Sequence, residues 1–335
     1  MPTASVATAL PLSRRRGPRV SAIALLAAVA LAWTMPAAKA EELIDTAVRA
    51  EMLKRRDGQI ARVETEFNDI FITKRRSELI LAFQVKGWDY TETIINLRDP
   101  DDLPVRYTQM MTLAVAYPEE TKKILMIGLG GGAISTYLGR FMPQTNIETV
   151  EIDPGVIAAA KKYFGIRASE RVRYSQADGR VFLTRSKELY DIILVDAFFG
   201  GYVPFHLLTK EFYTLIKQRL APGGVAAFNV HESTKLYAST VKTLSEVFQT
   251  IDLFPTGEGE VIVVVSDSPA LDRDALAKRA ATAQQRYNFR FPLTQFVQRR
   301  AADPKLEAVN GQLLTDDFAP VNLYDTIGKG PRRRK

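Results

Sequence analysis

The segment Ile124-Leu-Met-Ile-Gly128-Leu129-Gly130-Gly131-Gly132 decides the fold, because an apolar strand runs directly into a glycine-rich bend. After one helix length comes Val150-Glu151-Ile152-Asp153-Pro154, a second strand that ends in acids. Glycine tolerates positive φ and lets the backbone approach a ligand, and the free N–H groups of the next helix point into the same space. Glu151 lies 19 positions after Gly132, where a carboxylate can accept hydrogen bonds from both ribose hydroxyls. The pattern predicts a pocket for a nucleoside.

Two kinds of nucleoside site fit this pattern, because Gly128-x-Gly130-x-x-Ala133 also satisfies the dinucleotide fingerprint. A dinucleotide domain places a pyrophosphate at the helix N-terminus, whereas an S-adenosyl site uses the bend for the amino-acid end of its ligand. The segments that follow favour the S-adenosyl site. A third strand ends at Asp178, where an acid can bind an adenine edge, and a fourth ends at Asp196. Ligands bind at this edge of an open α/β sheet. The alternative for both acids is that they cap the following helices.

These residues carry a family resemblance that spans roughly 63 to 321. The chain resembles the spermidine synthase family of aminopropyltransferases, in particular its spermidine synthase-like branch. The matching segments are the glycine loop, Glu151-Ile-Asp153, Asp178-Gly179, Tyr190-Asp191, Val195-Asp196, Leu220-Ala-Pro-Gly-Gly224, Phe67-Asn-Asp-Ile-Phe, Tyr107-Thr-Gln-Met-Met and Leu314-Thr-Asp-Asp-Phe-Ala-Pro-Val321.

The resemblance implies roles for individual residues. Asp196 would be the base that accepts a proton from an amine nucleophile, and Tyr107 would orient that amine, although a half-buried tyrosine at an ordinary helix start is the alternative. Substrate-binding candidates are Gln109, Phe198 and Phe199. The co-substrate would be decarboxylated S-adenosylmethionine or S-adenosylmethionine, with no metal. Its expected contacts are Gly128, Gly130, Gly132, Glu151, Asp153, Asp178 and Gly179.

The chain also departs from the family pattern at three acidic positions. An acid expected inside the glycine loop, where it would hold the amine of the co-substrate, is Gly131 here. The second acid expected after the catalytic one is replaced by Ala197-Phe198-Phe199-Gly200, and the glutamate expected after the tyrosine is Gln109. An apolar wall of Phe198 and Phe199 would suit a less charged acceptor. The loop 197–206 has the composition of a substrate lid, or of an aromatic connection packed beneath the sheet.

The order of strands and helices predicts the fold class and the domains. From Lys122 onward the two alternate, which predicts an α/β fold with a Rossmann-like, class I methyltransferase-type, mostly parallel sheet. Alternation of apolar and polar residues over 62–96 predicts a small antiparallel β domain before it. We therefore expect a signal peptide at 1–40, an N-terminal helix, small β domain and linking helix at 41–119, the S-adenosyl-binding domain at 120–326 and a basic tail at 327–335.

Charge and compartment are set by the two ends of the chain. The formal net charge is +7, but residues 1–40 hold five basic and no acidic residues, and residues 329–335 hold five more basic residues. The remainder is slightly acidic, so a basic nucleic-acid-binding face is not expected. An arginine cluster, the apolar run 20–33 and Ala38-Lys39-Ala40 have the order of a cleavable signal peptide. We expect the protein to be exported to the periplasm. A membrane anchor is the alternative, but a spanning helix needs about 20 apolar residues, more than this run supplies.

Three function classes follow from the sequence. The first is a spermidine synthase-like transferase in polyamine biosynthesis, which moves an aminopropyl group to an amine acceptor. The second is an S-adenosylmethionine-dependent methyltransferase. The third is a non-catalytic exported protein that binds amines or nucleosides. The partner in each case is a small molecule; no nucleic acid and no stable membrane span after cleavage are expected, and a homodimer is compatible with the resemblance.

Overall fold

The computed structural model describes residues 42–85 and 87–317. The expected signal peptide at 1–40 and basic tail at 327–335 lie outside these residues. The described residues belong to one compact unit that begins at Glu42. Within them, no helix is both long enough and apolar enough to cross a bilayer.

A seven-stranded sheet forms the centre of this unit, with the strand order β10-β11-β9-β8-β5-β6-β7. Neighbouring strands from β9 to β7 run parallel, whereas β11 is antiparallel to both β9 and β10. The α/β fold and the mostly parallel, class I methyltransferase-type sheet predicted from the sequence are thereby confirmed. The strands are β5 (Lys123–Ile127), β6 (Asn146–Glu151), β7 (Val172–Gln176), β8 (Tyr190–Val195), β9 (Leu220–His231), β10 (Thr250–Pro255) and β11 (Glu260–Ser266).

Helices cover both faces of this sheet. On one face α5, α6 and α7 pack against Leu125, Ile193 and their neighbours, and on the other α2, α3 and α8 pack against Ile124 and Ile192. Strands buried on both faces are apolar at every position, which explains the continuous run in β5. The helices are α1 (Thr46–Lys54), α2 (Arg106–Met111), α3 (Ala133–Phe141), α4 (Pro154–Ala159), α5 (Gly179–Arg185), α6 (Lys210–Arg219), α7 (Tyr237–Val247), α8 (Arg273–Tyr287), α9 (Thr294–Val297) and α10 (Pro304–Glu307), with short turns η1 (Thr112–Ala116), η2 (Ala160–Phe164) and η3 (Phe205–Leu207).

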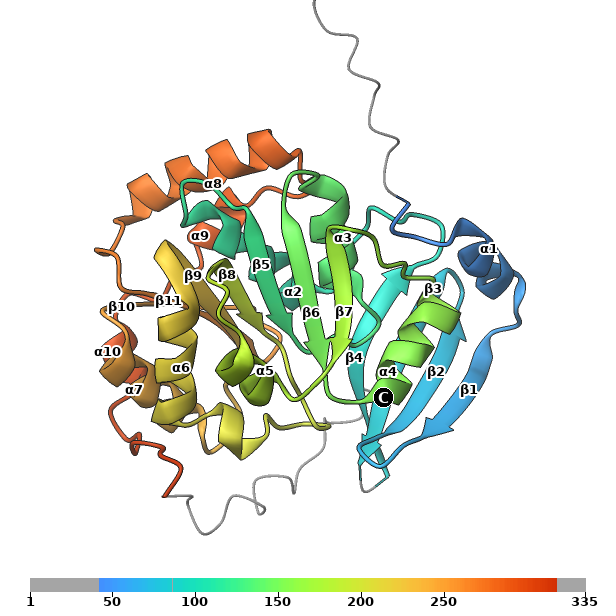
Figure 1. Ribbon diagram of the computed structural model, residues 1–335, viewed down its shortest axis with the longest axis horizontal. Coiled ribbons are helices and arrows are strands. Elements are labelled where there is room, and N and C mark those ends of the chain that lie inside the picture. Colours follow the sequence, from blue (N-terminus) through green and yellow to red (C-terminus); the bar gives the residue numbers. More distant parts are fainter. Residues whose placement is uncertain (1–41, 86, 318–335) are drawn as a thin grey trace, which may run out of the picture. The chain divides into compact units, whose positions relative to one another are not determined.

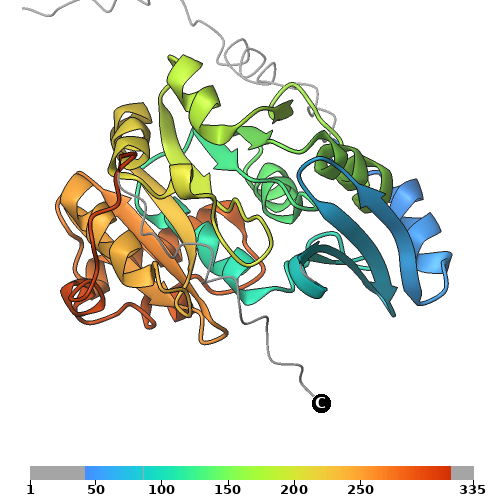
Figure 2. The same ribbon diagram turned by 90° about the horizontal axis from the view of Figure 1, so that it is seen from below.

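A second sheet of four antiparallel strands, in the order β1-β2-β3-β4, confirms the predicted small β region. Its apolar face, which includes Ile72 and Leu81, packs against α4 and η2 through Val156 and Phe164. In Figure 1 this sheet lies to the right of the larger one, and Figure 2 views both from below. The strands are β1 (Gly58–Glu64), β2 (Asp69–Arg75), β3 (Glu78–Val85) and β4 (Trp88–Asn96).

The ends of β5 and β8 meet at a point where the strand order reverses. The backbone N–H of Asp196 donates to the Ile127 carbonyl at 2.9 Å, and the Gly128 N–H donates to the Val150 carbonyl at 2.8 Å. Gly128 has φ of 96°, and a Cβ at this position would lie 2.1 Å from the Asp196 carbonyl oxygen. Glycine is therefore required here both for its backbone conformation and for the close approach of the two strand ends.

We expect Gly128→Ala to lower the free energy of unfolding by about 3 kcal/mol or more, because it combines a left-handed backbone with an overpacked contact. Gly223→Ala is the matched control. Gly223 also has positive φ, at 78°, but nothing lies within 4 Å of an added Cβ, so this variant should lose only about 1 kcal/mol. Urea unfolding of both variants measures the difference. Equal losses would show that the contact between Gly128 and Asp196 does not constrain the fold.

Candidate active site

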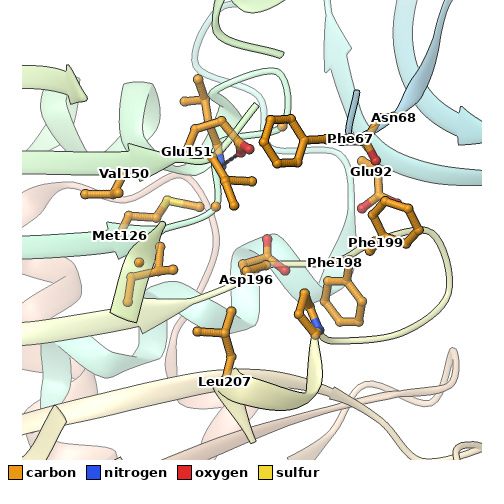
Figure 3. Close-up of a pocket in the computed structure, with 18 of the residues that line it drawn as sticks. Phe67, Asn68, Glu92, Met126, Val150, Glu151, Asp196, Phe198, Phe199 and Leu207 are labelled. Carbon is orange, nitrogen blue, oxygen red and sulfur yellow. Dashed lines mark hydrogen bonds between the residues drawn. The ribbon is translucent and has the colours of Figure 1, made fainter. Parts of the chain in front are cut away.

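A cavity opens at the carboxyl ends of β5, β6 and β8, where side chains from both sheets meet (Figure 3). The space between its lining atoms, open solvent at its mouth included, amounts to about 970 Å³. Its polar lining comes from different segments of the chain: the small sheet and its loops supply Asn68, Glu92 and Thr93, α2 supplies Tyr107 and Thr108, and the large sheet supplies Glu151, Asp178 and Asp196, with His206 in η3.

Glu151 is held by the glycine loop and by its own strand end. Its Oε2 accepts a hydrogen bond from the Leu129 N–H at 2.9 Å, and its Oε1 accepts one from the Asp153 N–H at 3.0 Å. Burial raises the pKa of this carboxyl. Each oxygen retains a lone pair for a ligand, so the two backbone bonds orient the carboxylate toward the cavity without occupying it fully.

Asp178 caps a helix and also lines the cavity. Its Oδ1 accepts a hydrogen bond from the Val181 N–H at 2.9 Å and thereby caps α5. Its Oδ2 lies 2.8 Å from Nε2 of His206, and both residues line the cavity. The bond from His206 holds the pKa of the Asp178 carboxyl below its usual range. A helix cap and a ligand contact are thus compatible at this strand end.

Asp196 lies at the end of β8 beside Tyr107. The Asn229 Nδ2 donates to Asp196 Oδ1 at 2.9 Å. Burial raises the pKa of Asp196 to about 6, and the hydrogen bond from Asn229 and the neighbouring Tyr107 hydroxyl oppose that rise. Burial also raises the pKa of Tyr107 well above its usual value, so this hydroxyl stays protonated and acts as a donor.

Glu92 is an acid of the cavity that the sequence analysis did not identify. It comes from β4, more than 30 positions before the glycine loop, and no motif marks it. Burial, and then the nearby Asp196 and Glu151, raise the pKa of this carboxyl well above its usual value. Figure 3 shows Glu92, Glu151 and Asp196 around the same open space. Asn68 and His206 are further lining residues to which the sequence analysis assigned no ligand role.

Three of the expected site residues lie outside the lining. Asp153 is fully buried and caps α4, and its Oδ2 accepts hydrogen bonds from Thr65 Oγ1 at 2.7 Å and Asn68 Nδ2 at 2.9 Å. It therefore positions Asn68 and does not itself face the cavity. The Gln109 Nε2 donates to the Leu103 carbonyl at 2.7 Å. Gly132 is the N-cap of α3. The other expected residues, Gly128, Gly130, Gly179, Glu151, Asp178, Asp196, Tyr107, Phe198 and Phe199, do line the cavity.

The loop after β8 places two aromatic rings in the cavity wall. Phe198 packs edge-on against His231, with ring centres 5.2 Å apart, and Phe199 packs against Tyr202 at 5.5 Å. A Cβ on Gly201 would lie 2.4 Å from Tyr90 of β4. The loop 197–206 thus packs against the small sheet and closes one side of the cavity with apolar surface.

The electrostatic character of the cavity is anionic. Four carboxylates line it, and among the described residues of the lining none is lysine or arginine. Buried charges in proteins are normally paired. The arrangement therefore favours a ligand that carries positive charge. Within the described part of the chain, no three His, Cys, Asp or Glu side chains gather as metal ligands would.

Comparisons with known proteins agree with this geometry. The model of the spermine/spermidine synthase domain matches residues 105–274. A polyamine aminopropyltransferase of Vibrio vulnificus is 31% identical over 267 residues, which cover 77% of this chain and 88% of that protein.

Solved structures show the same fold at lower sequence identity. A probable spermidine synthase from Corynebacterium glutamicum has a TM-score of 0.59 and 19% identity, covering 78% of this chain and 98% of the other. A spermidine synthase in complex with the transition-state analogue AdoDATO has a TM-score of 0.61 and 19% identity, covering 75% and 88%.

The raised pKa of Asp196 predicts a pH-dependent stability. The pKa of this carboxyl is about 6 in the folded protein, against 3.8 for an unperturbed aspartate. The free energy of unfolding is therefore unaffected by the group below the lower value, and it falls as the pH rises through the higher one. We expect the stability of the wild type relative to Asp196→Asn to fall by on the order of 2 kcal/mol between pH 4 and pH 7. Denaturant unfolding of both proteins across this range measures it. A constant difference would mean that Asp196 is not desolvated.

Proposed function

This chain belongs to the spermine/spermidine synthase family, and we propose that it transfers an aminopropyl group from decarboxylated S-adenosylmethionine to an amine acceptor. As a member of this family it is a transferase with a Rossmann-like fold. The name of the Vibrio relative supports aminopropyl transfer in polyamine biosynthesis. The assignment of individual residues below rests on the geometry of the cavity.

The donor's adenosine would lie along the carboxyl ends of β5, β6 and β7. Glu151 would accept hydrogen bonds from the ribose hydroxyls, and the two backbone N–H groups that orient its carboxylate support this role. Asp178, which also lines the cavity, would bind the adenine edge. The glycine loop lets the backbone approach the thioether end of the ligand, because Gly128 and Gly130 line the cavity without side chains.

The observation that carries the proposal is the charge of the cavity lining. Decarboxylated S-adenosylmethionine has a sulfonium and an ammonium and lacks a carboxylate. A lining with four carboxylates and no lysine or arginine among its described residues stabilises two positive charges, whereas a donor carboxylate would find no oppositely charged side chain there. This favours the decarboxylated donor over S-adenosylmethionine.

The reaction would be a displacement at the carbon next to the sulfonium. The amine nitrogen forms a bond to this carbon, the carbon–sulfur bond breaks, and its electron pair stays on sulfur, which leaves methylthioadenosine. The product nitrogen loses one proton, and Asp196 would accept it as base. A carboxyl with a pKa of about 6 is mostly ionised at pH 7 and can take up that proton. Tyr107, next to Asp196, would orient the amine.

The acceptor would lie against Phe198 and Phe199. Both rings line the cavity beyond Asp196, and they would pack on a carbon chain between amines. The residue Gln109, expected in the substrate contacts, bonds to the Leu103 carbonyl instead. Apolar surface on this side favours an acceptor with fewer charges near its reacting end.

Export remains a proposal from the sequence. We propose that residues 1–40 direct secretion, with the periplasm as the compartment and a retained membrane anchor as the alternative.

Product analysis separates the candidate functions. With decarboxylated S-adenosylmethionine and a diamine, we expect methylthioadenosine to accumulate in step with the new amine. S-adenosylhomocysteine from S-adenosylmethionine would indicate methyl transfer instead. Thermal stabilisation by ligand without either product would indicate a binding protein.

Asp196→Asn should lower kcat by about 100-fold or more, because a positioned base contributes this much. In the wild type, kcat/KM should rise as the pH passes through about 6, where Asp196 ionises. This rise should be absent from the pH profile of the variant. Chromatographic detection of methylthioadenosine gives both profiles. Unchanged turnover in Asp196→Asn would remove this residue from the mechanism.

The export proposal predicts a mature protein that begins at Glu41. Mass spectrometry of the N-terminal peptide from a Gram-negative host's periplasmic fraction measures it. Full-length chain in the membrane fraction would support the anchor, and full-length chain in the soluble cytosol would contradict export.

A further inference from the structure

A β-bulge places Glu92 in the cavity. Consecutive residues Leu81 and Ala82 of β3 pair with Thr93 and Thr91 of β4, so Glu92 is the extra residue on its strand. A bulge interrupts the alternation of a strand and redirects the side chain of the extra residue, and bulges are frequent beside active sites. The irregularity explains why an acid in the middle of a strand lines the cavity.

The hydroxyl of Tyr107 holds the bulge in place. It donates to the backbone carbonyl of Glu92 at 3.0 Å and adjoins the Asp196 carboxylate. The main chain of β4 is thus tied to the candidate base through one side chain. The position of the Glu92 carboxylate relative to Asp196 is therefore set by a hydrogen bond and does not depend on the loops alone.

The carboxylate of Glu92 has no protein partner. Across residues 42–85 and 87–317, neither a hydrogen bond nor an ion pair engages its side-chain oxygens, although those of Glu151, Asp178 and Asp196 accept hydrogen bonds. The charged groups that act most strongly on its pKa are the acids Asp196 and Glu151. A carboxylate in this setting is poorly solvated until a positively charged group enters the cavity.

The next residue of β4 places this carboxylate beside the glycine loop. The Gly131 N–H donates to Thr93 Oγ1 at 2.8 Å. A Cβ at Gly131 would lie 2.7 Å from the Phe164 ring and 2.8 Å from the Thr93 methyl group, so the loop has no room for an acidic side chain of its own. Glu92, the residue before Thr93, lines the cavity together with Gly128 and Gly130 of the loop.

We propose that Glu92 binds the ammonium of the donor's aminopropyl chain and is the residue that selects a donor without a carboxylate. The proposal rests on the proposed function, because it assigns a residue to the donor of that reaction. Glu92 would form a charge-assisted hydrogen bond to the ammonium, with Asp196 on the side of the acceptor and the glycine loop on the side of the sulfur. A donor carboxylate in the same place would be repelled by Glu92.

Binding of three adenosyl compounds to the wild type and to Glu92→Gln tests the proposal. Decarboxylated S-adenosylmethionine has two positive charges, S-adenosylmethionine has an additional carboxylate, and methylthioadenosine is neutral. In Glu92→Gln, we expect the dissociation constant of decarboxylated S-adenosylmethionine to rise at least about tenfold, since a hydrogen bond between charged groups is lost. The dissociation constant of methylthioadenosine should stay within about twofold, and the preference for the decarboxylated donor over S-adenosylmethionine should shrink by about the same tenfold.

Two further variants serve as controls in the same calorimetric titrations. Glu92→Asp keeps the charge on a shorter arm and should restore part of the lost affinity. Asp89→Asn removes one charge from an exposed position of the same strand, and all three compounds should bind it as they bind the wild type. A steady-state assay should show the Glu92→Gln effect in the KM of the donor and not in that of the amine acceptor.

The outcomes distinguish this inference from the proposed function. If Glu92→Gln binds the charged and the neutral compounds as the wild type does, or loses both equally, Glu92 does not hold the ammonium, while aminopropyl transfer by the wild type still stands. If the loss appears in the acceptor's KM, the residue belongs to the other substrate and the inference fails. If the wild type binds neither decarboxylated S-adenosylmethionine nor methylthioadenosine, the proposed function fails first and this inference falls with it.

Discussion

The close approach of Gly128 to the main chain of Asp196 is the constraint on which the rest of the site depends. It brings the end of β8 against the glycine loop, so that Asp196 and the loop line the same cavity. The same loop gives a backbone N–H to Glu151, which orients that carboxylate. A side chain at position 128 would separate the two strand ends and move the candidate base away from the loop. The geometry of three functional positions therefore follows from the absence of a single Cβ.

Ionisation of the buried carboxyl groups in the cavity is unfavourable in the ligand-free protein. Burial raises the pKa of Glu92, Glu151 and Asp196, which means that the folded state resists their ionisation. A ligand with positive charge stabilises the ionised form of these carboxyl groups. Part of its binding free energy therefore comes from interactions with carboxylates that the fold leaves poorly solvated. The preference for cations that we propose and the pH dependence of stability that we expect thus have the same origin, the desolvation of these carboxylates.

The sequence predicted the large sheet well and the site in part, for reasons that lie in particular residues. Glu151, Asp178 and Asp196 each end a strand with a strong apolar pattern, and the carboxyl ends of parallel strands meet at one edge. Asp153 has the same local signal, yet its carboxylate binds Thr65 and Asn68 of the small sheet. This contact joins residues more than 80 positions apart, and local patterns carry no information about it.

Glu92 was missed for a different physical reason. Side-chain alternation assigns each residue of a strand to a face, and this rule assumes an uninterrupted register. The bulge at Glu92 breaks the register, and only the partner strand reveals it. The small sheet therefore contributes to the cavity lining and also covers α4, because Asp153 holds Asn68 in the lining and Tyr107 holds the bulged strand. An acidic side chain for which the glycine loop has no room can come from this second sheet. On our proposal, the ligand preference can therefore change through β4 while the strands proposed to bind the nucleoside stay the same.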